Sequence, residues 1–94
     1  MIVAWDEIKN RNNQRKHKVS FETAQLVFED PLHVSRLERI EHGEQRWQTI
    51  GMVNGLVLLM VAHTVIEGDG QEAIRIISAR KANSNERRIY EQTH

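Results

Sequence analysis

The spacing of apolar positions changes near the middle of the chain, which predicts helices before that point and strands after it. In the first part, apolar residues recur every three or four positions and form one buried stripe, made of Phe21, Ala24, Val27 and Phe28. Ser20 is suited to cap this helix, and Pro31 ends it, because the residue before a proline disfavours helical geometry. A mostly polar helix is predicted before it, from Glu7 to about Lys16, with Asp6 as its N-cap.

The remaining apolar runs are shorter and richer in β-branched residues, as in strands. Strands are predicted at residues 33–39, 46–53, 56–65 and 73–80, with a short edge strand at residues 2–5. Asn54-Gly55 predicts a two-residue hairpin loop, because a type I′ turn needs positive φ at both central positions. A final helix follows, from Ser84 to about Gln92. The expected fold is α+β, an antiparallel β-sheet with two N-terminal helices packed on it and a short C-terminal helix.

Length and composition are those of a small globular protein. The 94 residues make one domain, 1–94, with 39% hydrophobic and 28% charged residues. The absence of cysteine excludes disulfides and thiolate zinc sites, and it fits a reducing cytoplasm. The N-terminus has no signal-peptide pattern, and the longest apolar run, residues 56–62, is too short to span a bilayer. We therefore expect a cytoplasmic protein with no membrane association. The histidines have no metal-ligand spacing, so neither a metal nor a cofactor is expected.

The charges cancel in number but are unevenly spread along the chain. Thirteen Lys and Arg balance thirteen Asp and Glu. Five basic residues and no acid fall in residues 8–19, and three basic residues and no acid fall in residues 73–85. Residues 20–45 hold six acids and two bases. This distribution predicts one basic and one acidic face, with any RNA binding more local than in a strongly basic protein.

The strand registers bring three potential site residues together. With Asn54-Gly55 as a two-residue loop, Arg46 lies opposite His63, and a second turn centred on Asp69 puts Arg75 opposite His63 on its other side. Directly paired residues share a face with Cβ atoms about 5 Å apart, so the three would form a row. Arginine can grip phosphate oxygens and histidine can transfer protons near neutral pH. A buried structural histidine with solvated arginines is the simpler explanation from the residues alone.

Other candidates are less specific. Lys16 and His17 end the first helix, where they can either complement the helix dipole or grip a phosphate. Arg80-Lys81 can bind phosphate or form an exposed basic turn. Tyr90, the one tyrosine of the chain, lies one helical turn from Arg87. A packing role is favoured for this tyrosine.

Several of these residues fall in motifs that resemble the BrnT family, the toxin half of a bacterial type II toxin–antitoxin pair. The N-terminal motif is Lys16-His17-x-Val19-Ser20-Phe21-x-x-Ala24-x-x-Val27-Phe28-x-Asp30-Pro31. The later ones are Glu44-x-Arg46-Trp47, His63-Thr64, residues 75–82 and Glu86-Arg87 with Tyr90. The chain departs from the usual pattern at Lys18, where glycine is common, and at Glu7, where proline is frequent.

The resemblance implies a RelE-like fold and a metal-independent endoribonuclease that inhibits translation and growth. In such an enzyme the ribose 2′-hydroxyl attacks the adjacent phosphate, which requires proton transfer and cationic stabilisation. The catalytic residues expected on this basis are Arg46, His63, Arg75, Lys16, His17 and Tyr90. The RNA- or phosphate-binding residues expected are Arg80, Lys81 and Arg87.

The resemblance also implies partners. A small BrnA-like antitoxin with a ribbon-helix-helix fold would neutralise the toxin, and operator DNA would be bound only through that antitoxin. Self-association into a homodimer is a further expectation, since a partner-dependent protein exposes apolar surface when alone. Two alternatives to an active ribonuclease stay open. One is a non-catalytic module that binds RNA or protein, and the other is an inactive toxin retained as an operon co-repressor.

Overall fold

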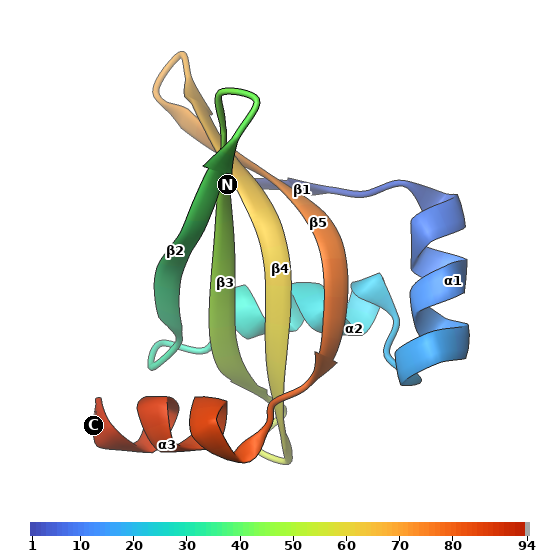
Figure 1. Ribbon diagram of the computed structural model, residues 1–94, viewed down its shortest axis with the longest axis vertical. Helices are drawn as coiled ribbons and strands as arrows, with labels where there is room; N and C mark the ends of the chain where they lie inside the picture. The colour runs from blue at the N-terminus through green and yellow to red at the C-terminus, as the bar shows by residue number, and fades with distance from the viewer. Residues whose placement is uncertain (94) are drawn as a thin grey trace.

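The computed structural model describes residues 1–93, in which a five-stranded sheet is flanked by short helices (Figure 1). The spatial order of the strands is β1-β5-β4-β3-β2. The elements in chain order are β1 (Ile2–Ala4), α1 (Glu7–His17), α2 (Phe21–Ala24), the 3₁₀ helix η1 (Gln25–Glu29), β2 (Val34–Glu41), β3 (Glu44–Val53), β4 (Val57–Gly68), β5 (Gln71–Lys81) and α3 (Ser84–Gln92). None of the helices in this part of the chain is both long and apolar enough to cross a membrane.

The sheet is mixed, which corrects the prediction of an antiparallel sheet. β1 runs parallel to β5, with Ile2 paired to Ala73 and Ala4 to Arg75, whereas the other neighbouring strands are antiparallel. Parallel neighbours require a long connection between them, and here residues 5–70 separate the two strands. The three-residue strand at residues 2–4 carries no pattern that indicates its direction.

α1 is attached to the sheet by polar groups rather than by an apolar stripe. The Asp6 carboxylate caps its start by accepting from the amide of Ile8 at 2.8 Å, as predicted. Its buried residues are Asn10 and Asn13. The Asn13 side chain donates to the carbonyls of Val19 and Ala79 and accepts from the amide of Ala79. Asn13 therefore joins α1 to β5 through hydrogen bonds that only an amide side chain provides.

The predicted second helix is divided into two parts. Ser20 caps it as expected, but α-helical geometry lasts only through Ala24 and η1 continues as a 3₁₀ helix to Glu29. η1 lies directly on β3, since a Cβ atom on Gly51 would come within 2.8 Å of Val27 Cγ1 and 2.9 Å of the Val27 carbonyl oxygen. Glycine at position 51 thus permits the close approach of η1 to β3.

Apolar side chains cover the two faces of the sheet unequally. On the face toward α1, α2 and η1, the buried cluster contains Val19, Phe21, Ala24, Val27, Val53, Leu59, Val61, Ile76 and Ala79. On the other face, a smaller cluster of Ile50, Leu58, Met60 and Tyr90 lies under α3. In Figure 1, α2 passes behind the sheet and α3 crosses its lower end only. The upper part of the second face is therefore not covered by a helix.

Both hairpin registers differ from the prediction by one residue. Asn54 and Gly55 have positive φ as expected, but Val53 pairs with Val57, so the loop holds three residues. Arg46 consequently pairs with Thr64. At the next hairpin Gly68 pairs with Gln71, and Thr64 pairs with Arg75. The predicted row of Arg46, His63 and Arg75 is wrong. Because both shifts run in the same direction, the two arginines stay in one row while His63 lies on the opposite face.

Candidate functional site

A row of directly paired residues crosses four strands on the part of the second face that α3 leaves uncovered. Arg39 of β2 pairs with Arg46 of β3, Arg46 with Thr64 of β4, and Thr64 with Arg75 of β5. Two further arginines lie on the same face, closer to α3. Arg36 of β2 pairs with Gln48 of β3, and Arg80 of β5 contacts Glu86 of α3. We call this surface the open face, and its residues are Arg36, Arg39, Arg46, Gln48, Thr64, Arg75 and Arg80. Five guanidinium groups thus gather on one surface of a chain whose net charge is zero.

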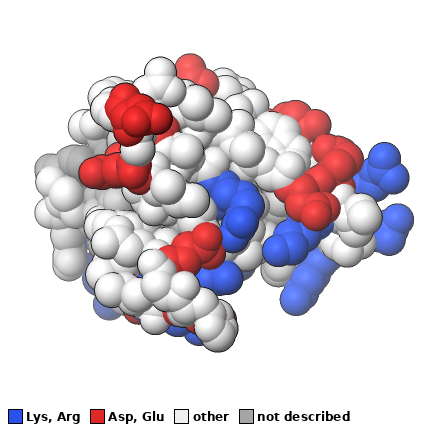
Figure 2. Space-filling model, turned by 90° about the horizontal axis from the view of Figure 1, so that it is seen from above, with Lys and Arg blue, Asp and Glu red and all other residues white. Residues whose placement is uncertain are grey.

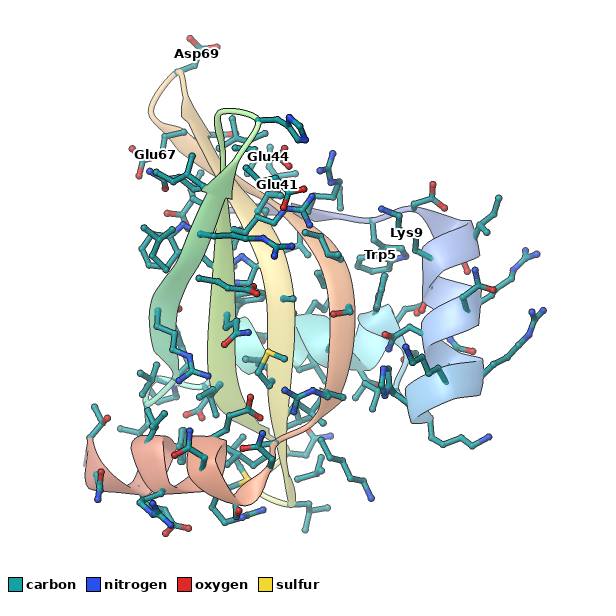
Figure 3. The ribbon with its side chains drawn as sticks, in the orientation of Figure 1. Trp5, Lys9, Glu41, Glu44, Glu67 and Asp69 are labelled. Carbon is teal, nitrogen blue, oxygen red and sulfur yellow. The ribbon has the colours of Figure 1, made fainter. Side chains whose placement is uncertain are left out.

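Carboxylates are interleaved with these arginines at the end of the β2–β3 hairpin. Glu44 accepts from Arg75 Nη2 at 3.0 and 3.3 Å, and its Oε1 lies 4.0 Å from Arg46 Nη2. Glu41 lies 2.9 Å from Arg39 Nε. Figure 3 shows Glu41 and Glu44 close together at this end of the sheet. Figure 2, which looks onto the hairpin end, shows basic atoms set between acidic ones rather than a continuous basic surface.

Arg80 is held in place by Glu86 of α3. The two guanidinium nitrogens of Arg80 donate to the two carboxylate oxygens of Glu86 at 2.8 and 2.9 Å. Glu86 also accepts from the amide of Asn83 and completes a capping box at the start of α3. Burial acts to raise the pKa of Glu86, but the hydrogen bonds from Arg80 and Asn83 outweigh it and lower the pKa. This bidentate pair fixes both the arginine and the helix.

Two buried polar atoms in the row have no hydrogen-bond partner within residues 1–93. They are the hydroxyl oxygen of Thr64 and Nε of Arg46. Arg46 Nε lies 3.9 Å from Glu41 Oε2, which is too far for a hydrogen bond. A buried group left unsatisfied costs about 1–3 kcal/mol. Such groups are uncommon in folded proteins. Two of them on directly paired residues leave hydrogen-bonding groups at the centre of the open face that a ligand can use.

His63 lies behind the row, in the core against η1. Its Nε2 is 2.7 Å from the Thr49 hydroxyl and its Nδ1 is 3.1 Å from the Thr64 carbonyl oxygen. The ring packs edge-on against Phe28 with centroids 4.9 Å apart. Burial lowers the pKa of His63, although the hydrogen bond to Thr64 opposes that change. This arrangement is that of a neutral, hydrogen-bonded core histidine, which is the simpler of the two predictions from sequence.

The buried state of His63 predicts a pH-dependent stability. The unfolded chain takes up a proton near the ordinary value of 6.5, whereas the folded chain resists protonation of His63. Stability from this residue is therefore complete above that value and falls as the pH decreases below it. Urea unfolding between pH 7 and pH 5 should show this fall, and His63→Gln should reduce its slope. The matched control is His42→Gln, which alters a fully exposed histidine in the β2–β3 turn; an equal effect of both changes would contradict the assignment.

Four of the predicted basic residues lie away from the open face. Lys16 is exposed and His17 is half-buried at the C-terminal end of α1. The side chain of Lys81 belongs to a cavity of about 500 Å³ between α1 and the sheet, together with Lys18, Ser20 and Thr23. Arg87 is exposed on α3 and lies 4.0 Å from Glu91. The nine predicted residues thus occupy separate places, and only Arg46, Arg75 and Arg80 of them lie on the open face.

Tyr90 is a packing residue of α3 whose hydroxyl is also hydrogen-bonded. Its side chain joins the cluster of Ile50, Leu58 and Met60, and its hydroxyl donates to Asp30 at 2.7 Å. Burial first, and then the hydrogen bond and charge of Asp30, raise the pKa of Tyr90 to about 12. The same Asp30 carboxylate accepts from the amide of Met52 at 2.7 Å. The contact therefore joins α3, β3 and the segment after η1.

Removing the Tyr90 hydroxyl should weaken this junction in a pH-dependent way. Burial acts to raise the pKa of Asp30, but hydrogen bonds from Met52, Tyr90 and Leu32 lower it below its ordinary 3.8. The stability contributed by Asp30 is thus present above 3.8 and is lost as the pH falls further. We expect Tyr90→Phe to lower the free energy of unfolding by about 1–2 kcal/mol at neutral pH, with a smaller loss at pH 3. Urea unfolding at both pH values measures this, and a loss that does not change with pH would contradict it.

Sequence reasoning missed several residues of this site. Arg36 and Arg39 were not selected, because residues 33–39 alternate poorly and a bulge between Leu37 and Arg39 breaks the two-residue period of β2. Glu44 stands two positions before Arg46, which places both on one face of β3, and this spacing is the signal that could have identified it. Thr64 gave no signal apart from its position next to His63. Within residues 1–93, no three His, Asp or Glu side chains are grouped as ligands for a metal ion.

Comparisons with known proteins agree with the motifs. Residues 5–86 match the model of a family described as the ribonuclease toxin BrnT of type II toxin–antitoxin systems. Among solved structures, the chain is similar to the crystal structure of the ribonuclease toxin BrnT from Brucella abortus, with a TM-score of 0.64 and 31% sequence identity over 89% of this chain and 99% of that one. A search of curated proteins finds no match. The chain belongs to the BrnT family of ribonuclease toxins of type II toxin–antitoxin systems.

Proposed function

We propose that this chain is a RelE-like, metal-independent endoribonuclease that binds the scissile phosphate of RNA on the open face. The observation that carries the proposal is the row of Arg39, Arg46, Thr64 and Arg75, in which two arginines flank a buried hydroxyl without a partner among residues 1–93. A planar guanidinium fork binds phosphate oxygens in pairs. Arginines held on adjacent strands can therefore stabilise the charge that grows on phosphorus as the 2′-hydroxyl attacks.

In this proposal the strands hold the two central arginines in position before RNA binds. Arg46 and Arg75 extend from β3 and β5 on either side of β4, so their backbone positions are fixed by two hydrogen-bonded ladders. Groups held in place before the substrate arrives lose little entropy on binding and act fully in the transition state. Arg46 and Arg75 would bind the reacting phosphate of the RNA. The neighbouring phosphates of the RNA backbone would be bound by Arg36, Arg39 and Arg80.

The other residues expected from sequence have roles outside the reacting centre in this proposal. His63 and Tyr90 support the sheet, and Tyr90→Phe is expected to retain cleavage. Lys16, His17 and Lys81 are on the α1 side of the molecule, where their charge can attract RNA without contacting the scissile phosphate. Arg87 is exposed on α3, where its charge can attract RNA in the same way.

The proposal includes the partners of a type II toxin. RNA is the substrate, and a BrnA-like ribbon-helix-helix antitoxin neutralises the toxin in the cytoplasm by covering the open face. Its acidic side chains would take the place of phosphate on the arginines. In this proposal operator DNA is contacted only through the antitoxin. Exposed apolar residues such as Leu37 and Ile40 on the edge strand β2 fit a homodimer or antitoxin contact.

Cleavage of a defined RNA by the purified chain in EDTA tests the proposed function. The expected products carry 2′,3′-cyclic phosphate and 5′-hydroxyl ends, which identify attack by the 2′-hydroxyl without a metal. Expression without an antitoxin should arrest growth. A folded chain that cuts no RNA, alone or with ribosomes present, would overturn the proposal and favour a binding module or an inactive toxin.

A further inference from the structure

We propose that Glu44 is the general base that removes the proton of the 2′-hydroxyl, an inference that rests on the proposed function. Transesterification needs a proton acceptor beside the cationic phosphate site. Glu44 is the first residue of β3, directly after the tight His42-Gly43 turn, in which both residues have positive φ. The turn holds its carboxylate over the row that contains Arg46 and Arg75.

The position of the carboxylate fits this task. Glu44 Oε1 lies 3.0 Å from Arg75 Nη2 and 4.0 Å from Arg46 Nη2, so one carboxylate reaches the two arginines that flank Thr64. A guanidinium has five donors, and the contact with Glu44 occupies only one edge of Arg75. The other donors of Arg75 stay available to a phosphate, and in the proposed complex the 2′-hydroxyl lies beside the Glu44 carboxylate. The Glu44 side chain is 27% exposed, so a ribose can reach it.

Other candidate bases on the sheet and on α3 are less suited. The carboxylate of Glu86 is 3% exposed and engaged by Arg80 and the amide of Asn83. Glu41 pairs with Arg39, on the side of the row away from Arg75. His63 lies on the opposite face. The Tyr90 hydroxyl, on α3 at the other end of the sheet, donates a hydrogen bond to Asp30.

Stability alone gives little reason for a carboxylate at this position. Partly exposed ion pairs contribute little to stability, and Arg75 is 49% exposed. A carboxylate that neutralises two phosphate-binding arginines also weakens RNA binding by competition. Glu44 therefore weakens RNA binding where it stands, and a catalytic role would offset that loss.

The proposed step is a transesterification at phosphorus. The Glu44 carboxylate takes the 2′-hydroxyl proton while the 2′-oxygen forms a bond to phosphorus. The bond between phosphorus and the 5′-oxygen breaks, and that oxygen takes a proton from water. The products are a 2′,3′-cyclic phosphate and a 5′-hydroxyl, and Glu44 returns its proton to solvent. The charged groups around the carboxylate are Arg46 on β3, Arg75 on β5, Glu41 on β2 and His42 in the turn.

Glu44→Gln separates catalysis from binding because it keeps the shape of the side chain and removes its basicity. We expect kcat to fall about 10²- to 10⁴-fold. The Kd for an RNA with a 2′-deoxy nucleotide at the cleavage site should stay equal or become tighter, since a competing charge is removed. The acid limb of the pH profile of kcat should disappear, and Glu44→Asp should restore part of the activity. The control is Glu29→Gln, which removes an exposed carboxylate on η1, behind the sheet.

The outcomes are distinguishable. Cleavage by Glu44→Gln at the rate of the unaltered chain, or a parallel loss of cleavage and RNA binding, would overturn the role of Glu44 and leave the proposed function intact. Absence of cleavage by the unaltered chain would overturn the proposed function and this inference with it. A lower kcat with unchanged or tighter binding of the 2′-deoxy RNA supports the assignment.

Discussion

Replacing Arg75 with alanine is expected to lower kcat/KM for RNA cleavage about 10²- to 10³-fold, the usual effect of removing one donor that stabilises transition-state charge. Arg75 is half-exposed and its one ion pair within residues 1–93 is with Glu44, so the fold should be retained. The same loss is expected for Arg46→Ala, and the double variant should lose less than the product of both effects, because the two side chains hold one phosphate.

The control for this prediction is Arg11→Ala, which removes an exposed arginine on α1 and the same unit of charge. Initial rates on a short fluorescent RNA, with circular dichroism to verify folding, measure both variants. Equal effects of Arg11→Ala and Arg75→Ala would show that net charge matters rather than the row on the open face.

Replacing Asn13 with alanine is expected to lower the free energy of unfolding by about 3–5 kcal/mol, a large part of the 5–15 kcal/mol typical of a small domain. The side chain is 6% exposed and makes three hydrogen bonds to the backbone. Its loss leaves the carbonyls of Val19 and Ala79 and the amide of Ala79 without their partner. Each such buried group costs about 1–3 kcal/mol.

Asn12→Ala is the matched control, since Asn12 is an exposed neighbour on the same helix and its replacement should change stability by no more than about 0.5 kcal/mol. Urea unfolding followed by tryptophan fluorescence measures both. A loss of the same small size for the two variants would mean that apolar contacts, rather than Asn13, hold α1 on β5.

The elements were predictable where local chemistry decides them. Asp6, Ser20 and the Asn54-Gly55 turn are placed as their side chains and backbone preferences require. The register of the β3–β4 hairpin was not predictable, because β4 is apolar at nearly every position from Val57 to Val65 and both registers bury similar side chains. The exposed Leu56, at 87%, shows that the loop rather than the strand contains this residue.

The candidate site was predicted only in part, because it depends on the strand registers. Arg46 and Arg75 were placed together because two register errors cancelled between β3 and β5, whereas His63 on the strand between them was assigned to the wrong face. Arg39 entered the row only through the bulge in β2, and bulges follow from tertiary packing rather than from local pattern. The direction of β1 depends likewise on contacts between the two ends of the chain.

The central claim is that RNA lies on the open face, and the most direct measurement is an NMR titration of the ¹⁵N-labelled chain with a 2′-deoxy-substituted RNA that resists cleavage. We predict that the guanidinium signals of Arg46, Arg75 and Arg80 and the amide signals around Glu44 and Thr64 change on binding. Changes confined to Lys16, His17 and the cavity beside Lys81 would contradict the account and move the RNA site to the α1 side of the sheet.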